Sequence, residues 1–176
     1  MTIVERGKTM ALDHQVLLFE QGIKPALLVG GFNSLRRGET TKRAEYLDER
    51  LSKYPKISFS HRGNKLYFQN EQARKQFLSV GITTTTIGGV DYRDYSRWYL
   101  GIALGFPPSA VDFFCGLPDE LWKKTDKTFI DYYGIAFTCR REDVDNCLLW
   151  CNEHYLIPTE LKMSLPYKVE DMVHKS

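Results

Sequence analysis

Two short segments of alternating polarity, which flank Gly63-Asn64, constrain the fold of this chain most strongly. Residues 57–61 read Ile-Ser-Phe-Ser-His, and residues 65–69 read Lys-Leu-Tyr-Phe-Gln. Alternation places every second side chain on one face of a strand, and Gly63-Asn64 between the segments is typical of a tight β-hairpin. We therefore predict a hairpin over residues 57–69. Its buried face should carry four apolar side chains: Ile57, Phe59, Leu66 and Phe68.

The rest of the chain mixes helical patterns with isolated strands. Apolar residues at helical spacing predict helices within residues 12–21, 41–54, 70–81, 91–106, 108–114, 117–124 and 141–155. Runs of apolar or β-branched residues predict strands at residues 25–30, 82–87 and 132–139. Little pattern follows Pro158, so we expect an irregular tail there.

This order of elements favours one fold class. Helices and strands do not alternate regularly, as they would in a doubly wound parallel sheet, and no change of composition marks a linker. We therefore predict an α+β fold in which a small, mostly antiparallel sheet, including the 57–69 hairpin, packs against several helices. Residues 1–176 are expected to form a single globular domain.

The composition suits a water-soluble protein. No apolar run approaches the roughly 20 residues that cross a bilayer, and the first 15 residues lack the apolar core of a secretory signal. The four cysteines show no paired-bridge spacing, which favours reduced thiols. The sequence therefore predicts a cytoplasmic, soluble protein that does not associate with membranes, and its oligomeric state is left open.

Cysteine and histidine suggest chemistry at one helix. Cys147, Cys151 and His154 share a helical face, and thiolates and imidazoles are zinc ligands. The same cysteines also belong to a regular apolar stripe, and free cysteine packs as a small hydrophobe. We therefore favour core packing and predict no metal or cofactor, although the sequence leaves both interpretations open.

No catalytic signature stands out in the sequence. Cys115 lies near a predicted helix C-terminus, where the partial negative charge disfavours a thiolate, so we interpret it as structural. The glycines of residues 30–34 follow a predicted strand but match no phosphate-binding motif, and a plain turn is the favoured interpretation. An enzyme assembled from scattered side chains stays an alternative.

The most suggestive stretch for binding is residues 83–97. It joins a threonine-rich strand to Gly88-Gly89 and then to a cluster of acidic, aromatic and basic side chains. Such a cluster can stack on a flat ring, hold a phosphate and bond a sugar hydroxyl, whereas capping of the next helix and core packing are the alternatives. The predicted ligand-binding residues are Thr84, Thr86, Asp91, Tyr92, Arg93 and Arg97.

A basic middle region offers a different partner. Residues 36–75 carry 11 Lys+Arg against 5 Asp+Glu, a local balance of +6, although the chain as a whole is only +2. A basic hairpin with an outward aromatic ring can track nucleic-acid phosphates and stack a base. The residues assigned to this alternative are Arg62, Lys65 and Tyr67. A pI near 8.3 makes nucleic acid an unlikely partner for this chain.

Three functional hypotheses follow from these observations. The first is a non-catalytic protein that binds a small anionic, nucleotide-like ligand at residues 84–97. The second is an inhibitor or adaptor that docks on a larger partner protein, because the chain is rich in aromatic residues with ten Tyr, ten Phe and three Trp. The third is nucleic-acid binding through residues 36–75.

Overall fold

The computed structural model describes residues 3–30, 39–59 and 64–172. Within these ranges, helices pack with small, purely antiparallel sheets, and the predicted α+β class is confirmed. The chain divides into two compact units, one of Met1–Lys8 with Pro25–Leu104 and one of Thr9–Lys24 with Gly105–Ser176. The single domain over residues 1–176 stays a prediction.

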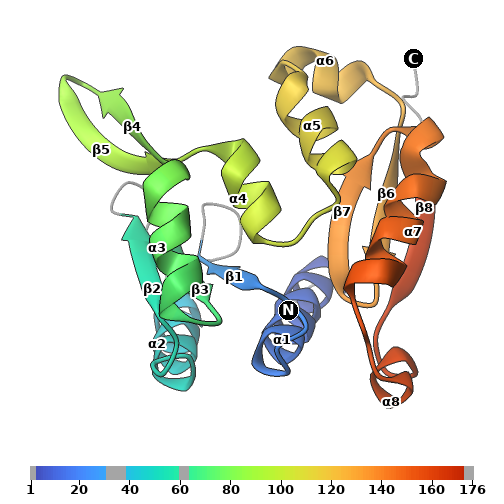
Figure 1. Ribbon diagram of the computed structural model, residues 1–176, viewed down its shortest axis with the longest axis horizontal. Coiled ribbons are helices and arrows are strands. Elements are labelled where there is room, and N and C mark those ends of the chain that lie inside the picture. The colour runs from blue at the N-terminus through green and yellow to red at the C-terminus, as the bar shows by residue number, and fades with distance from the viewer. Residues whose placement is uncertain (1–2, 31–38, 60–63, 173–176) are drawn as a thin grey trace. The chain divides into compact units, whose positions relative to one another are not determined.

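The first unit contains most of the N-terminal half of the chain (Figure 1). Its elements are β1 (Ala26–Val29), α2 (Glu39–Arg50), β2 (Lys56–Phe59), β3 (Asn64–Phe68), α3 (Glu71–Val80), β4 (Ile82–Ile87), β5 (Val90–Tyr95) and α4 (Arg97–Ala103). Strands β1, β3 and β2 form an antiparallel sheet with β3 in the centre, and β4 and β5 form a separate two-stranded ribbon.

The predicted hairpin is the β2–β3 pair. Ile57 pairs with Leu66, and Phe59 pairs with Asn64, so the four predicted apolar side chains share one face and all are buried. The prediction of a tight turn at Gly63-Asn64 is wrong, because Asn64 is a buried strand residue. The connection therefore spans residues 60–63, which lie outside the described residues.

Helices cover both faces of this sheet. On one face, Phe77 of α3 packs on Phe68 with ring centroids 5.6 Å apart. Asn70 caps α3, because its side chain accepts a hydrogen bond of 2.9 Å from the backbone N–H of Ala73. On the other face, the buried side chain of Tyr67 donates a hydrogen bond from its hydroxyl to Asp48 of α2. The sheet is thus sandwiched between α2 and α3.

The β4–β5 ribbon adds a strand that the sequence analysis does not predict. The helix predicted within residues 91–106 is present as α4, which begins at Arg97, and residues 90–95 before it form strand β5. Gly88 and Gly89 have φ angles of 57° and 79°, which suit the two-residue turn that joins antiparallel strands. The double glycine therefore makes a hairpin turn and does not end the β structure.

The second unit is built on another three-stranded antiparallel sheet, with strand order β7-β6-β8. Its elements are most of α1 (Ile3–Glu20), α5 (Pro108–Gly116), α6 (Asp119–Lys124), β6 (Lys127–Tyr132), β7 (Ile135–Cys139), the short 3₁₀ turn Arg141–Asp143, α7 (Val144–His154), α8 (Thr159–Lys162) and β8 (Tyr167–Met172). The sheet, α5, α7 and Leu18 of α1 share one apolar core.

Two elements of this sheet differ from the prediction. The single strand predicted at residues 132–139 is broken by a turn at Tyr133 and Gly134, whose φ angles are 51° and 89°. The side chain of Asp131 stabilises the turn by accepting a hydrogen bond of 2.7 Å from the N–H of Gly134. Strand β8 lies in the tail predicted to be irregular, and all six of its residues are exposed.

Candidate functional site

The β4–β5 hairpin carries most of the residues predicted to bind a ligand. Thr84 is paired with Arg93 across the two strands. Thr86 is paired with Asp91 two residues further along, so these four positions lie on one face of the ribbon. Tyr92, one residue from Asp91, lies on the opposite face. The hairpin therefore brings four of the predicted positions together and separates the predicted aromatic ring from them.

The acidic side chains of the hairpin accept hydrogen bonds from its own threonines. Thr86 donates to Asp91 over 2.7 Å, and Thr85 donates to Asp94 over 3.2 Å. Asp94 also accepts from the backbone N–H of Tyr95 over 2.9 Å. These bonds fix the register of the two strands. Asp91, one of the predicted ligand-binding residues, is thus already a hydrogen-bond acceptor within the hairpin.

The tip of the hairpin and the helix α4, which follows the opposite end of the hairpin, both expose apolar groups. Ile87 and Val90 pair across the turn, and they are 43% and 53% exposed. In α4, Trp98 and Tyr99 are each 39% exposed and their rings meet edge to face at 5.1 Å. Arg97, the remaining predicted residue, is exposed at the start of this helix. Within the described ranges, neither β4 nor β5 pairs with a third strand.

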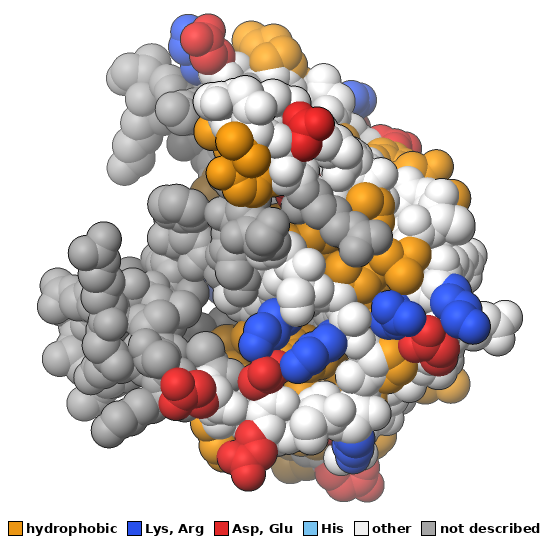
Figure 2. Space-filling model, turned by 90° about the vertical axis from the view of Figure 1, so that its left-hand side faces the viewer, with side chains coloured by type: hydrophobic (Ala, Val, Ile, Leu, Met, Phe, Trp, Pro, Cys, Tyr) orange, Lys and Arg blue, Asp and Glu red, His pale blue; other side chains and the backbone are white. Residues whose placement is uncertain are grey.

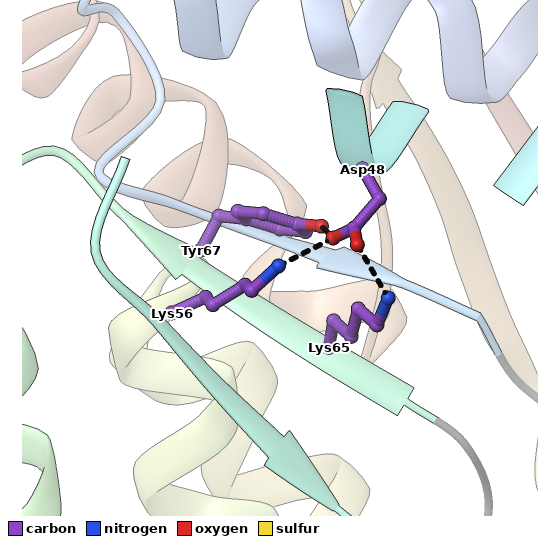
Figure 3. Close-up of polar contacts among 4 residues, drawn as sticks. All are labelled: Asp48, Lys56, Lys65 and Tyr67. Carbon is purple, nitrogen blue, oxygen red and sulfur yellow. Dashed lines mark hydrogen bonds and ion pairs between the residues drawn. The ribbon is translucent and has the colours of Figure 1, made fainter. Parts of the chain in front are cut away.

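A second polar cluster centres on Asp48 of α2 (Figure 3). Its carboxylate contacts three side chains of the neighbouring sheet: Lys56 Nζ at 2.6 Å, Tyr67 Oη at 2.5 Å and Lys65 Nζ at 2.9 Å. These contacts, led by Lys56, hold the pKa of Asp48 well below its usual range. Burial and the adjacent carboxylate raise the pKa of Tyr67. The cluster ties α2 to β2 and β3.

The Asp48 cluster involves two of the three residues assigned to nucleic-acid binding, Lys65 and Tyr67. The sequence places Tyr67 on the outer face of the hairpin, but α2 covers that face and the side chain of Tyr67 is fully buried. Lys65 is engaged by Asp48. A buried ring offers no surface for a base, so the stacking role predicted for Tyr67 is wrong. Arg62, the third residue of this hypothesis, lies outside the described residues.

Charges of both signs are interleaved on the face that Figure 2 draws. Lysine or arginine side chains lie beside aspartate or glutamate side chains at several places, with hydrophobic side chains between them. The Asp48 cluster has this character, and so does the pair of Arg74 and Glu71, which is 2.5 Å long. Neighbouring carboxylates thus partly neutralise the basic charge of residues 36–75 at Lys56, Lys65 and Arg74.

Cys147, Cys151 and His154 do not converge on one point. Both cysteines are fully buried in the apolar core, and burial raises the pKa of Cys151 to about 12, so this thiol stays protonated. His154 is exposed, stacks on Trp150 with ring centroids 4.0 Å apart, and has Nδ1 2.8 Å from the carbonyl oxygen of Trp150. Among the described residues, no three His, Cys, Asp or Glu side chains gather as metal ligands.

Lys24 is a buried ionisable group that the sequence does not reveal. It lies just after α1, where Gly22 has a φ of 72° and the N–H of Lys24 donates to the carbonyl oxygen of Leu18 over 3.1 Å. Its side chain has no exposed area, and its ammonium lies 5.0 Å from the ring centre of Phe106. Burial lowers its pKa to about 8. Such an amine is a stronger nucleophile at neutral pH than an exposed lysine, but a substrate reaches it only if the surrounding structure opens.

Two remaining observations concern phosphate and membrane binding. Of the predicted turn at residues 30–34, a candidate for a phosphate-binding loop, only Gly30 lies within the described residues. In the part of the chain that the structure describes, every helix is too short or too polar to span a bilayer.

No protein-family model matches this chain, and the searches of curated proteins and of solved structures found no significant match either.

Proposed function

We propose that this chain is a non-catalytic binding protein that docks on a larger partner protein through the tip of the β4–β5 hairpin and α4. The observation that supports this most is the exposed pair of Ile87 and Val90 at the end of a two-stranded ribbon. Apolar and aromatic side chains that exclude water at the centre of an interface supply most of its binding free energy. Trp98 and Tyr99 add aromatic anchors of this kind.

The shape of this element supports a protein partner over a small molecule. Small-molecule sites are concave and bury most of the ligand, whereas a ribbon exposed along β4 presents a protruding surface. The strand edges of such a ribbon offer backbone groups that an extended segment can pair with. The partner we infer offers an extended segment for this edge and an apolar depression for the tip.

Replacing Val90 with aspartate should weaken docking by about thirtyfold, because it places a charge in the apolar contact at the tip, and single residues of an interface can contribute about 2 kcal/mol or more. The same change at Leu156, which is 85% exposed in the other unit, is the matched control. A photoreactive amino acid at position 87 of the full chain, expressed in the native host, should crosslink one discrete partner that mass spectrometry identifies.

The proposal requires that the Val90→Asp change removes this crosslink and that the Leu156→Asp change leaves it intact. Recovery of the same proteins from a photoreactive residue at Met163, which is 86% exposed in the other unit, would contradict docking through the hairpin. Unchanged circular dichroism of both variants shows that the fold is retained.

The second candidate is the binding of a small anionic, nucleotide-like ligand by the same hairpin. One observation favours it: Thr84, Thr86, Asp91 and Arg93 share a face of the ribbon. On this hypothesis, native mass spectrometry of gently purified protein should detect extra mass that disappears on denaturation. The Arg97→Ala change should abolish the extra mass, whereas Arg74→Ala, at a residue paired with Glu71, should not. A clean mass for the unmodified chain favours docking instead.

A cytoplasmic location belongs to this proposal. Cys139, Cys147 and Cys151 are free thiols, and reducing compartments maintain thiols in this state. Fractionation of the native host with an antibody to the chain tests it, and recovery from a secreted fraction would contradict it.

A further inference from the structure

Strand β8 is an exposed edge strand. It pairs with β6 along one side, and among the described residues its other side has no strand partner. All six of its residues are exposed, although the ring of Tyr167 packs on those of Tyr132 and Tyr133. An edge of this kind presents unpaired backbone groups and is a template for pairing with another strand.

The side chains of β8 have a charge pattern that is complementary to itself. Lys168 and Glu170 lie on one face of the strand and form an ion pair of 2.6 Å. Val169 lies between them on the other face and is 43% exposed. The pattern from position 168 to position 170 is therefore positive, apolar, negative. A rotation of the strand by 180° about an axis that passes through Val169 perpendicular to the sheet places Lys168 where Glu170 was, and Glu170 where Lys168 was.

This pattern fits a second copy of the chain in one register. In an antiparallel pair of strands related by a two-fold axis perpendicular to the sheet, directly opposite residues have their side chains on the same side of the sheet. With Val169 opposite its own copy, Lys168 of each chain faces Glu170 of the other. Tyr167 then faces Asp171, whose charge is already balanced by Arg141 of its own chain.

Neighbouring registers are unfavourable for the same reason. Moving the two-fold axis by one residue toward the C-terminus places Glu170 opposite Glu170. Moving it by one residue toward the N-terminus places Lys168 opposite Lys168. Like charges directly opposite each other destabilise a strand pair, so the charges of β8 select the register centred on Val169.

We propose that two copies of this chain form a symmetric dimer by antiparallel pairing of β8 with β8, with Val169 at the two-fold axis and Lys168 facing Glu170 across it. The pairing joins the two β7-β6-β8 sheets into one continuous sheet. Charged residues on an edge strand ordinarily oppose pairing, but here each charge meets its opposite. The dimer uses a different unit from the β4–β5 hairpin, so it stands or falls independently of the docking function.

Light scattering after size exclusion should give the full-length protein twice its chain mass of 20.4 kDa. Lys168→Glu and Glu170→Lys should each raise the dimer dissociation constant at least about tenfold, because each creates two like-charge pairs in place of two attractive ones. An equimolar mixture of the two variant chains should form a heterodimer, since opposite charges then face each other at both positions. Lys124→Glu, on an exposed part of α6, is the matched control and should leave the dimer intact.

The mixing experiment separates the proposal from an effect on the fold of a single chain, because a misfolded variant is not restored by a second misfolded variant. Val169→Arg should abolish the homodimer by placing two positive charges on the axis. A monomer at every concentration that stays soluble would overturn the proposal. So would a dimer that survives both charge reversals and the Val169 change, because that dimer uses another surface.

Discussion

Replacing Lys24 with methionine should remove a rise in stability between pH 8 and about 10.5, because methionine carries no ionisable group at this buried position. Lys24 has no exposed surface, and burial lowers its pKa from 10.5 to about 8. Methionine has a similar length and carries no charge, so it fills the same space without the cost of desolvation.

The pH dependence of stability gives the sharper test of Lys24. Between pH 8 and about 10.5, the unfolded chain holds a proton at this residue that the folded chain has lost. Stability therefore rises with pH in this window, by about 3 kcal/mol over its full width. Burial raises the pKa values of Tyr67 and Tyr155, so these hydroxyls ionise first in the unfolded chain and oppose the rise near its upper end.

Urea unfolding of the wild type and of the Lys24→Met variant at several values between pH 7 and 10 measures this effect. The rise should be present in the wild type and absent from the variant, since the two tyrosines contribute equally to both. Lys75→Met, at an exposed position of α3, should leave the pH dependence unchanged. The same slope in wild type and Lys24→Met would show that the lysine is not held in an apolar environment.

Replacing Asp48 with alanine should cost about 2–3 kcal/mol of unfolding free energy. The change leaves the Tyr67 hydroxyl without its charged acceptor, and hydrogen bonds to charged groups contribute about 1.5–3 kcal/mol. The two lysine contacts add less, because their side chains are about one-third exposed and solvent screens them. Asp48→Asn should cost less, since its side-chain oxygen still accepts from Tyr67.

Acid should diminish the effect of the Asp48 substitutions. The pKa of Asp48 is lower in the folded chain than in the unfolded chain, so its contribution is fully present above its ordinary pKa. The contribution is lost as the pH falls further, toward the pKa of the folded state. Urea unfolding at pH 7 and at pH 3 should therefore give a smaller difference between wild type and Asp48→Asn at pH 3.

Controls divide the Asp48 cluster into its contacts. Tyr67→Phe removes only the hydroxyl and should cost about 1–2 kcal/mol. Glu49→Ala, at the next and exposed residue of α2, should have little effect. Equal losses from Glu49→Ala and Asp48→Ala would mean that the helix, and not the cluster, is what the substitutions disturb.

The sequence predicts well those elements whose signals are local. The alternation of residues 57–69 identifies the β2–β3 hairpin and its buried face, because a strand period of two residues is imposed by backbone geometry alone. Asn70 marks the start of α3, since an N-cap needs only the first turn of its own helix. The apolar stripe with Cys147 and Cys151 identifies the inner face of α7.

The sequence fails where local patterns are ambiguous or absent. The aromatic residues after position 94 suit a helix, and that helix forms from Arg97, but residues 90–95 pair with β4 as a strand. A Gly-Gly pair can either end a strand or form the turn of a hairpin. At Gly88-Gly89 the pairing of β4 with β5 makes it a hairpin turn. Strand β8 alternates in polarity only over its first four residues, and its pairing with β6 extends it to Met172.

The amino-acid sequence by itself thus determined the α+β class, the 57–69 hairpin and the inner faces of several helices, because these depend on periods of two or 3.6 residues along the chain. Tertiary structure alone decided that α2 buries Tyr67 beneath Asp48 and that Lys24 loses all contact with water. Both outcomes arise because segments far apart in the chain exclude solvent from a side chain that its own neighbours would leave exposed. Burial of a single polar group is a property of those packed segments, and no local pattern of residues encodes it.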